Sequence, residues 1–170
     1  VPYAAARLFF YSFRGWILET MARQREKYEG VRQASPEEVE SLRSQAKAEL
    51  PSRLAELATR YGFIYNKVTI KHNATNWGSC SAKGNINLNL NIVRLPKILQ
   101  DYILLNELCH LRHQDHGHAF HLLLEHVLTD NLMNALNYPD ESQTDADIAV
   151  PKELARKTAT SRAKYPLHYV

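Results

Sequence analysis

A chain of 170 residues, of which 45% are apolar and 23% charged, can build one domain with a proper core, which excludes an intrinsically disordered protein. The formal net charge of +3 is spread along the sequence, so it does not indicate a nucleic-acid-binding surface. No apolar run reaches the roughly 18 residues needed to span a bilayer, and the first residues lack a signal-peptide cleavage pattern. We therefore expect a soluble, cytoplasmic protein in which Cys80 and Cys109 are free thiols.

Two helices are predicted in the first third of the chain. Residues 8–29 carry apolar side chains at helical spacing and a basic outer face, which favours a packing helix with a solvated side. The stretch SPEE at 35–38 is a strong helix start, because serine caps free N–H groups, proline suits the first turn and acids favour the positive end of the helix dipole. An apolar stripe then continues past Pro51, so we predict a long, kinked helix that ends near Tyr61 and Gly62.

Alternating apolar residues predict strands in the middle of the chain. Residues 67–71 alternate Lys or Thr with Val or Ile, and residues 85–92 alternate Asn with Ile or Leu. The segment SAKGN at 81–85 indicates a hairpin turn. Asparagine has a low propensity for strands, so four asparagines along one predicted strand require an explanation. The amides could bond a neighbouring strand, a substrate backbone or each other, or they could form a solvated sheet face.

Two further helices and a tail complete the predicted elements. Pro96 opens a helix that we expect to run through residues 98–112, a break follows at 114–117, and a last helix covers 119–129. Beyond residue 138 the composition turns first acidic and then basic, with little material for a core. We therefore predict one domain over residues 1–138 and a partly irregular C-terminal tail over 139–170.

The chemistry-bearing part of the chain is a histidine cluster. Six of the eight histidines fall within 17 residues: His110, His113, His116, His118, His121 and His126. At 100° per residue, positions 106, 110 and 113 lie within about 60° of one another on a helix, opposite a stripe of leucines, and Glu107 lies beside this face. The polar side chains of this predicted helix face are thus gathered around one position.

Such a face is typical of metal-assisted hydrolysis. Zinc takes three protein ligands and keeps a position for a water, whose pKa it lowers towards about 7. Ligands at i and i+4 project from one helix face, and a Glu directly after the first can act as general base. The third ligand usually comes from beyond the helix, and here the turn at 115–117 returns an imidazole to the site.

Two separate motifs of the chain resemble one known family. NELCHLRHQDHGHAF, residues 106–120, resembles the HELxHLxxxxHxxxF segment of the YgjP-like family, zincin metallopeptidase-type hydrolases related to SprT-like and WLM proteins. NWGSCSAKGNINLN, residues 76–89, resembles the RWGSCSxxGxIxLN strand and hairpin of the same family. LPKILQDYILLNEL, residues 95–108, resembles its proline-opened helix. Motifs in the right order are far harder to obtain by accident than a lone HExxH.

The resemblance implies an α+β, zincin-like fold. It has N-terminal helices, a small antiparallel sheet with a hairpin, an active-site helix and a following C-terminal helix. It further implies zinc as the cofactor, with His110 as second ligand, His116 as third and Glu107 as general base. Asn106 occupies the place of the first histidine ligand. Because an amide oxygen is a weaker donor to zinc than imidazole, we expect the metal to be bound weakly or to be absent.

The resemblance also implies a substrate-binding strand beside the site. It is formed by Trp77, Gly78 and Ser79 together with Cys80, and the glycine permits close approach of the backbone. Asn76 stands where the family commonly has Arg. The expected substrate is a peptide or protein.

Several side chains near the motif have more than one possible role. His113 shares the helix face and could replace the missing ligand, and Cys80 or Cys109 could donate a thiolate or pack as a small apolar group. His121 could contact substrate or could form a hydrogen bond with a metal-ligating residue. It could also be a packing or surface residue, which is the interpretation favoured for His118 and His126. Asp115 could orient an imidazole or cap the last helix.

Three functional hypotheses follow from these residues. The first is a zinc-dependent hydrolase of the metallopeptidase type, weakened by Asn106. The second is a catalytically silent zincin-like module that binds a peptide or another partner along the Asn-rich strand. The third, nucleic-acid binding, is suggested by the SprT-like relatives, and the absence of a concentrated basic patch counts against it.

Overall fold

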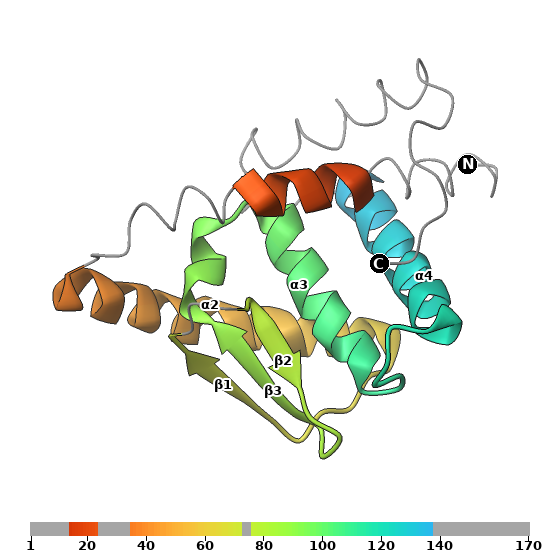
Figure 1. Ribbon diagram of the computed structural model, residues 1–170, viewed down its shortest axis with the longest axis horizontal. Helices are drawn as coiled ribbons and strands as arrows, with labels where there is room; N and C mark the ends of the chain where they lie inside the picture. The colour runs from red at the N-terminus through yellow and green to blue at the C-terminus, as the bar shows by residue number, and fades with distance from the viewer. Residues whose placement is uncertain (1–13, 24–34, 73–75, 138–170) are drawn as a thin grey trace. The chain divides into compact units, whose positions relative to one another are not determined.

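The computed structural model describes residues 14–23, 35–72 and 76–137 (Figure 1). Residues 34–127 form one compact unit, and the helical residues 14–23 belong to another. The rest of the predicted first helix and the predicted tail lie outside the described residues, so the domain boundary at residue 138 stays a prediction. Within the described ranges, no helix has both the length and the apolar character needed to cross a membrane.

The long helix α2, Pro36–Tyr61, has the predicted ends. The Ser35 hydroxyl accepts a hydrogen bond from the Glu38 N–H at 3.2 Å, and Gly62 ends the helix in the left-handed conformation with φ 72°. The helix continues through Pro51. Its buried face is made by Ala46, Leu50, Leu54, Leu57 and Ala58. These local signals sufficed to place the helix because each acts within one turn.

The sheet has three strands, β1 (Lys67–Lys71), β2 (Gly78–Cys80) and β3 (Asn85–Asn89), in the order β1-β3-β2. The strand β2 pairs antiparallel with β3, but β1 pairs parallel with β3. The α+β class is confirmed, whereas the predicted antiparallel sheet was wrong, because the sheet is mixed. Parallel neighbours need a crossover of about a dozen residues or more, and residues 72–84 provide one that contains β2.

The predicted hairpin turn joins β2 to β3. The Gly84 N–H donates to the Ser81 carbonyl at 3.0 Å, and Gly84 has φ 80°, a conformation that glycine adopts without steric cost. The strand predicted to reach residue 92 stops at Asn89, and Leu90–Arg94 form the 3₁₀ helix η1. The Asn89 side chain causes this change, because its oxygen accepts from the Asn91 N–H at 3.0 Å and caps η1.

The asparagine side chains in and directly after β3 form hydrogen bonds with neighbouring segments and with one another. Asn85 accepts from the Asn66 amide at 2.8 Å, and the Asn87 amide donates to the Ser79 hydroxyl on β2 at 3.1 Å. The Asn89 amide donates to the Asn76 carbonyl at 3.0 Å. The row therefore ties β3 to the segments on both of its sides.

Two helices follow the sheet. The helix α3, Lys97–His110, begins after Pro96 as predicted and ends two residues before the predicted end at residue 112. The predicted break is present, and α4, His118–Asn137, runs longer than the predicted 119–129. In the unit of residues 34–127, α2 packs against β1, η1 and α3, and α3 packs against β2 (Figure 1). This places α3 between the long helix and the edge strand.

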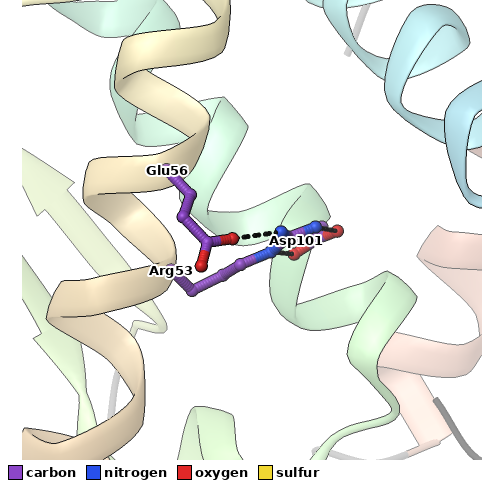
Figure 2. Close-up of polar contacts among 3 residues, drawn as sticks. All are labelled: Arg53, Glu56 and Asp101. Carbon is purple, nitrogen blue, oxygen red and sulfur yellow. Dashed lines mark hydrogen bonds and ion pairs between the residues drawn. The ribbon is translucent and has the colours of Figure 1, made fainter. Parts of the chain in front are cut away.

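A bidentate ion pair joins α2 to α3 (Figure 2). Arg53 donates from Nε to Oδ1 of Asp101 at 2.9 Å and from Nη2 to Oδ2 at 2.7 Å. Its remaining nitrogen donates to Glu56 at 2.8 Å. Asp101 is buried, and its hydrogen bond to Arg53 raises the pKa of the guanidinium. Two parallel bonds to one carboxylate fix orientation as well as distance.

The other end of α3 is tied to α2 by Arg112. Its guanidinium donates to the carbonyls of Gly62 at 2.8 Å and Tyr61 at 3.3 Å, and it lies 4.3 Å from the centre of the Phe63 ring. A cation at a helix C-terminus interacts favourably with the dipole and satisfies carbonyls that have no helical partner. Both ends of α3 are thus anchored to the same helix.

The ion pair between the helices gives the first prediction. Asp101→Asn should lower the free energy of unfolding by about 2 kcal/mol, because a buried charged partner is lost. Glu56→Gln removes only the exposed partner of Arg53 and should cost at most about 0.5 kcal/mol. Urea denaturation of the two variants measures both values. Equal losses would contradict the assignment of the stabilisation to Asp101.

Candidate active site

The last two turns of α3 carry the residues of the histidine motif. Leu104 and Leu108 are fully buried on the predicted rear face, and Asn106 is half-buried. Glu107 and His110 are buried polar side chains, 6% and 9% exposed. Because residues three apart are neighbours on a helix surface, the carboxylate and the imidazole lie on adjoining parts of one face.

The turn after α3 brings His116 back to His110. The centres of the two imidazole rings lie 4.7 Å apart, with the rings nearly perpendicular at 86°. Two imidazoles that bind one zinc ion through nitrogens at 2.0–2.1 Å have ring centres about 5 Å apart. The structure thus brings these two predicted ligands together at a suitable distance.

The hydrogen bond made by His110 defines which of its nitrogens is available. Its Nδ1 lies 2.9 Å from the His113 carbonyl oxygen. Since a carbonyl can only accept, Nδ1 carries the proton and Nε2 keeps its lone pair. Burial lowers the pKa of His110, which also favours the neutral ring. A neutral imidazole with its other nitrogen bonded to a carbonyl is the form in which histidine binds metals.

Phe120 is the site residue that the sequence analysis missed. It lies at the start of the helix predicted over residues 119–129, and it is 1% exposed. Its ring stacks on His110 with centres 4.3 Å apart and lies 5.2 Å from the ring of His116. The final phenylalanine of the family motif was the signal that could have pointed to this role.

Glu107 lies against β2. A Cβ on Gly78 would lie 3.1 Å from the Cγ and 3.2 Å from the Oε1 of Glu107, so only glycine lets the strand approach this closely. Burial raises the pKa of Glu107 to about 7, and a 3.5 Å hydrogen bond from the Asn106 amide acts in the opposite direction. A carboxyl group that titrates near neutral pH is suited to accept a proton and release it again.

The other two predicted substrate-binding residues flank Gly78 at the edge of the sheet. The Trp77 carbonyl accepts from the Asn89 N–H at 2.9 Å, and the side chain is half-buried. Ser79 is exposed, although its hydroxyl accepts from Asn87. Gly78 itself lies in close contact with Glu107.

The alternative histidines lie in different settings. His113 lies beyond the end of α3, so the prediction that it shares the helix face was wrong, and it contributes its carbonyl to His110. His118 and His126 are exposed. His121 is buried, with its ring 5.4 Å from that of Phe120. Asp115 accepts from the Gly117 N–H at 3.0 Å, so its carboxylate shapes the turn before α4.

The two thiols also differ in their surroundings. Cys109 is fully buried, and burial raises its pKa to about 12. Such a group keeps its proton at neutral pH, which argues against ligation by a Cys109 thiolate. Cys80 is half-buried on β2, and its pKa is raised by burial and by the Glu107 charge.

The sequence of the chain matches the family model of the YgjP-like metallopeptidase domain over residues 37–133. The chain belongs to this family. The matched region begins in the first turn of α2 and ends within α4, so it contains the sheet, α3 and all candidate site residues. No curated protein and no solved structure matches the chain at a significant level. The resemblance found from the two motifs is thereby confirmed.

A YgjP-like metallopeptidase domain implies a metal ion, typically zinc. Among the residues that the structure describes, no group of three or more His, Cys, Asp or Glu side chains could hold such an ion. The ring separation of His110 and His116 suits two imidazole ligands of one zinc ion, and the residue four positions before His110 on α3 is Asn106, whose amide oxygen is a weaker donor than an imidazole. The described residues therefore offer two imidazoles to a zinc ion.

The contact between Gly78 and Glu107 gives the second prediction. Gly78→Ala should lower the free energy of unfolding by about 1–3 kcal/mol, because the added methyl group meets Glu107 and the Asn87 carbonyl. In a Glu107→Ala background the first of these contacts is gone, and the cost should shrink by about 1 kcal/mol. Denaturant unfolding of the four proteins measures this coupling. The same cost in both backgrounds would show that Glu107 does not lie against β2.

The surroundings of the two cysteines give the third prediction. Iodoacetamide at pH 8 should label about one thiol per native chain, at Cys80, because Cys109 is inaccessible and keeps its proton. Labelling at Cys80 itself should be slower than for a free thiol, since its pKa is also raised. Peptide mass spectrometry locates the label, and the chain unfolded in urea serves as the control in which both thiols react. Equal labelling of both in the native chain would refute the buried position of Cys109.

Proposed function

We propose that the chain is a zinc-dependent hydrolase of peptide bonds. In this proposal His110 and His116 hold the metal, Asn106 supplies a weaker third donor and Glu107 is the general base. The observation that carries it is the 4.7 Å approach of the two imidazoles, one of which has its Nδ1 bonded to a backbone carbonyl. Glu107 adjoins His110 on the same helix, as a general base next to a metal ligand must.

The chemistry divides between the metal and the chain. When bound, zinc would act as a Lewis acid that lowers the pKa of a water towards about 7 and polarises the scissile carbonyl. Glu107 would accept a proton from the attacking water and would give it to the leaving amine. Its pKa of about 7, raised by burial, suits both transfers at neutral pH. The buried setting also keeps bulk water away from the carboxylate.

The edge of the sheet supports a peptide as substrate. The strand β2 is the outer strand next to α3, and an outer strand can pair with an extended peptide through its backbone groups. Trp77 and Ser79 flank Gly78, which lies against Glu107. A peptide on this strand would therefore run past the general base.

Asn106 supports weak metal binding. Its amide group donates towards Glu107 at 3.5 Å, and its side chain is shorter than that of histidine. Loss of a group that only supports a ligand typically lowers metal affinity by about 10- to 100-fold, and a change in the ligand itself should cost at least as much. We therefore expect the protein as purified to contain less than one zinc per chain.

Restoring the imidazole at position 106 tests the proposal. Asn106→His should raise zinc affinity by about 10- to 100-fold and should raise peptide hydrolysis with it. Zinc content by elemental analysis and affinity by competition with a chelator measure the first effect, and a broad peptide library measures the second. A wild-type chain that already holds one tightly bound zinc would refute the role given to Asn106.

Matched variants separate binding from catalysis. His110→Ala should abolish zinc binding, whereas Glu107→Gln in the Asn106→His background should keep zinc and lose hydrolysis by about 100-fold or more. If Asn106→His binds zinc normally and cleaves no peptide in the library, the hydrolase proposal fails. A silent module that binds a peptide along β2 would then be the better account.

A further inference from the structure

Phe120 contacts three imidazoles at once. Its ring stacks on His110 with centres 4.3 Å apart and an interplanar angle of 16°. It meets His116 edge to face at 5.2 Å and 87°, and His121 at 5.4 Å and 77°. A buried phenylalanine in a core usually needs only apolar neighbours, so this concentration of polar rings asks for an explanation.

The contacts restrict His110 in two independent ways. The bond from Nδ1 to the His113 carbonyl fixes one edge of the imidazole. The stack on Phe120 fixes the plane of the ring. An imidazole held at one edge and on one face has little freedom left to rotate about either side-chain torsion.

The orientation of the His116 ring depends on Phe120 more strongly than that of the His110 ring. It lies in the exposed turn between α3 and α4, where a side chain ordinarily samples several rotamers. Its ring packs edge to face against both His110 and Phe120. Phe120 is therefore common to both imidazoles and adjoins them from a third element, the first turn of α4.

We propose that Phe120 is a positioning residue that sets the mutual orientation of the His110 and His116 imidazoles. It does so in the folded chain without metal, so that both rings are arranged before an ion binds. The consequence for zinc rests on the function proposed above. Arranging ligands in advance lowers the ordering cost of binding, and a site with only two imidazoles depends on this more than a site with three.

Phe120→Leu tests the proposal, because leucine keeps an apolar side chain in the core and removes the ring. In the metal-free full-length protein, the ring protons of His110 and His116 should give a nuclear Overhauser cross-peak in the NMR spectrum of the wild type, because the two ring centres lie 4.7 Å apart. In the variant this cross-peak should weaken by more than about twofold, because the two rings are no longer held in one mutual orientation. Zinc affinity by chelator competition should fall about tenfold.

Two matched variants distinguish positioning from stability. Leu124→Ala makes a cavity one turn further along α4, at a side chain that is also buried, 4% exposed, and has no ring. It should destabilise the fold while the intensity of the His110–His116 cross-peak and the zinc affinity stay within about twofold of the wild type. Phe120→Tyr keeps the ring, so its cross-peak should resemble that of the wild type even if the buried hydroxyl lowers stability.

The outcomes separate this inference from the proposed function. If Phe120→Leu is folded and the His110–His116 cross-peak keeps its wild-type intensity, the positioning role is refuted. If the cross-peak weakens but zinc affinity changes no more than in Leu124→Ala, Phe120 does not act on metal binding and the inference also fails. Failure of the wild type and of Asn106→His to bind zinc would instead refute the proposed function, while the NMR comparison would still decide how the rings are held.

Discussion

The bidentate bond between Arg53 and Asp101 fixes the helix on which the candidate site depends. Asp101 lies on α3 less than two turns before Asn106, and a rotation of α3 by one residue, 100°, would break both bonds to Arg53. Arg112 holds the far end of α3 to the C-terminus of α2. With both ends tied to one partner, the direction in which Glu107 and His110 face is determined by α2 rather than by a metal.

The burial of α3 then sets the chemistry of its side chains. The helix packs against α2 and β2, and most of its residues are buried. A carboxyl group in this setting loses hydration, which raises the pKa of Glu107, and the absence of a side chain at Gly78 lets the strand close against it. Such a buried carboxyl group opposes folding when it is ionised, and groups of this kind concentrate at functional sites.

The sequence predicted those parts of the structure that depend on local interactions. The ends of α2 followed from Ser35 and Gly62, and the buried leucines of α3 followed from helical periodicity. The parallel pairing of β1 with β3 did not follow, because it joins residues that lie 18 apart in the sequence, such as Lys67 and Asn85. The pair Arg53 and Asp101 was missed for the same reason, since 48 residues separate its members in the sequence. The early end of β3 was in principle readable, because an Asn side chain often competes for backbone N–H groups.

Asparagine at position 106 affects one proposed metal donor and leaves in place the contacts that hold the other site residues. His110 is held by the His113 carbonyl and by Phe120, His116 by these two rings, and Glu107 by contact with β2. All of these contacts come from the protein itself. Because these contacts are present with asparagine at position 106, the proposed function confines the weakness of the site to the strength of a single donor. On that proposal the site would bind and release zinc according to its concentration, and a third imidazole would raise its affinity.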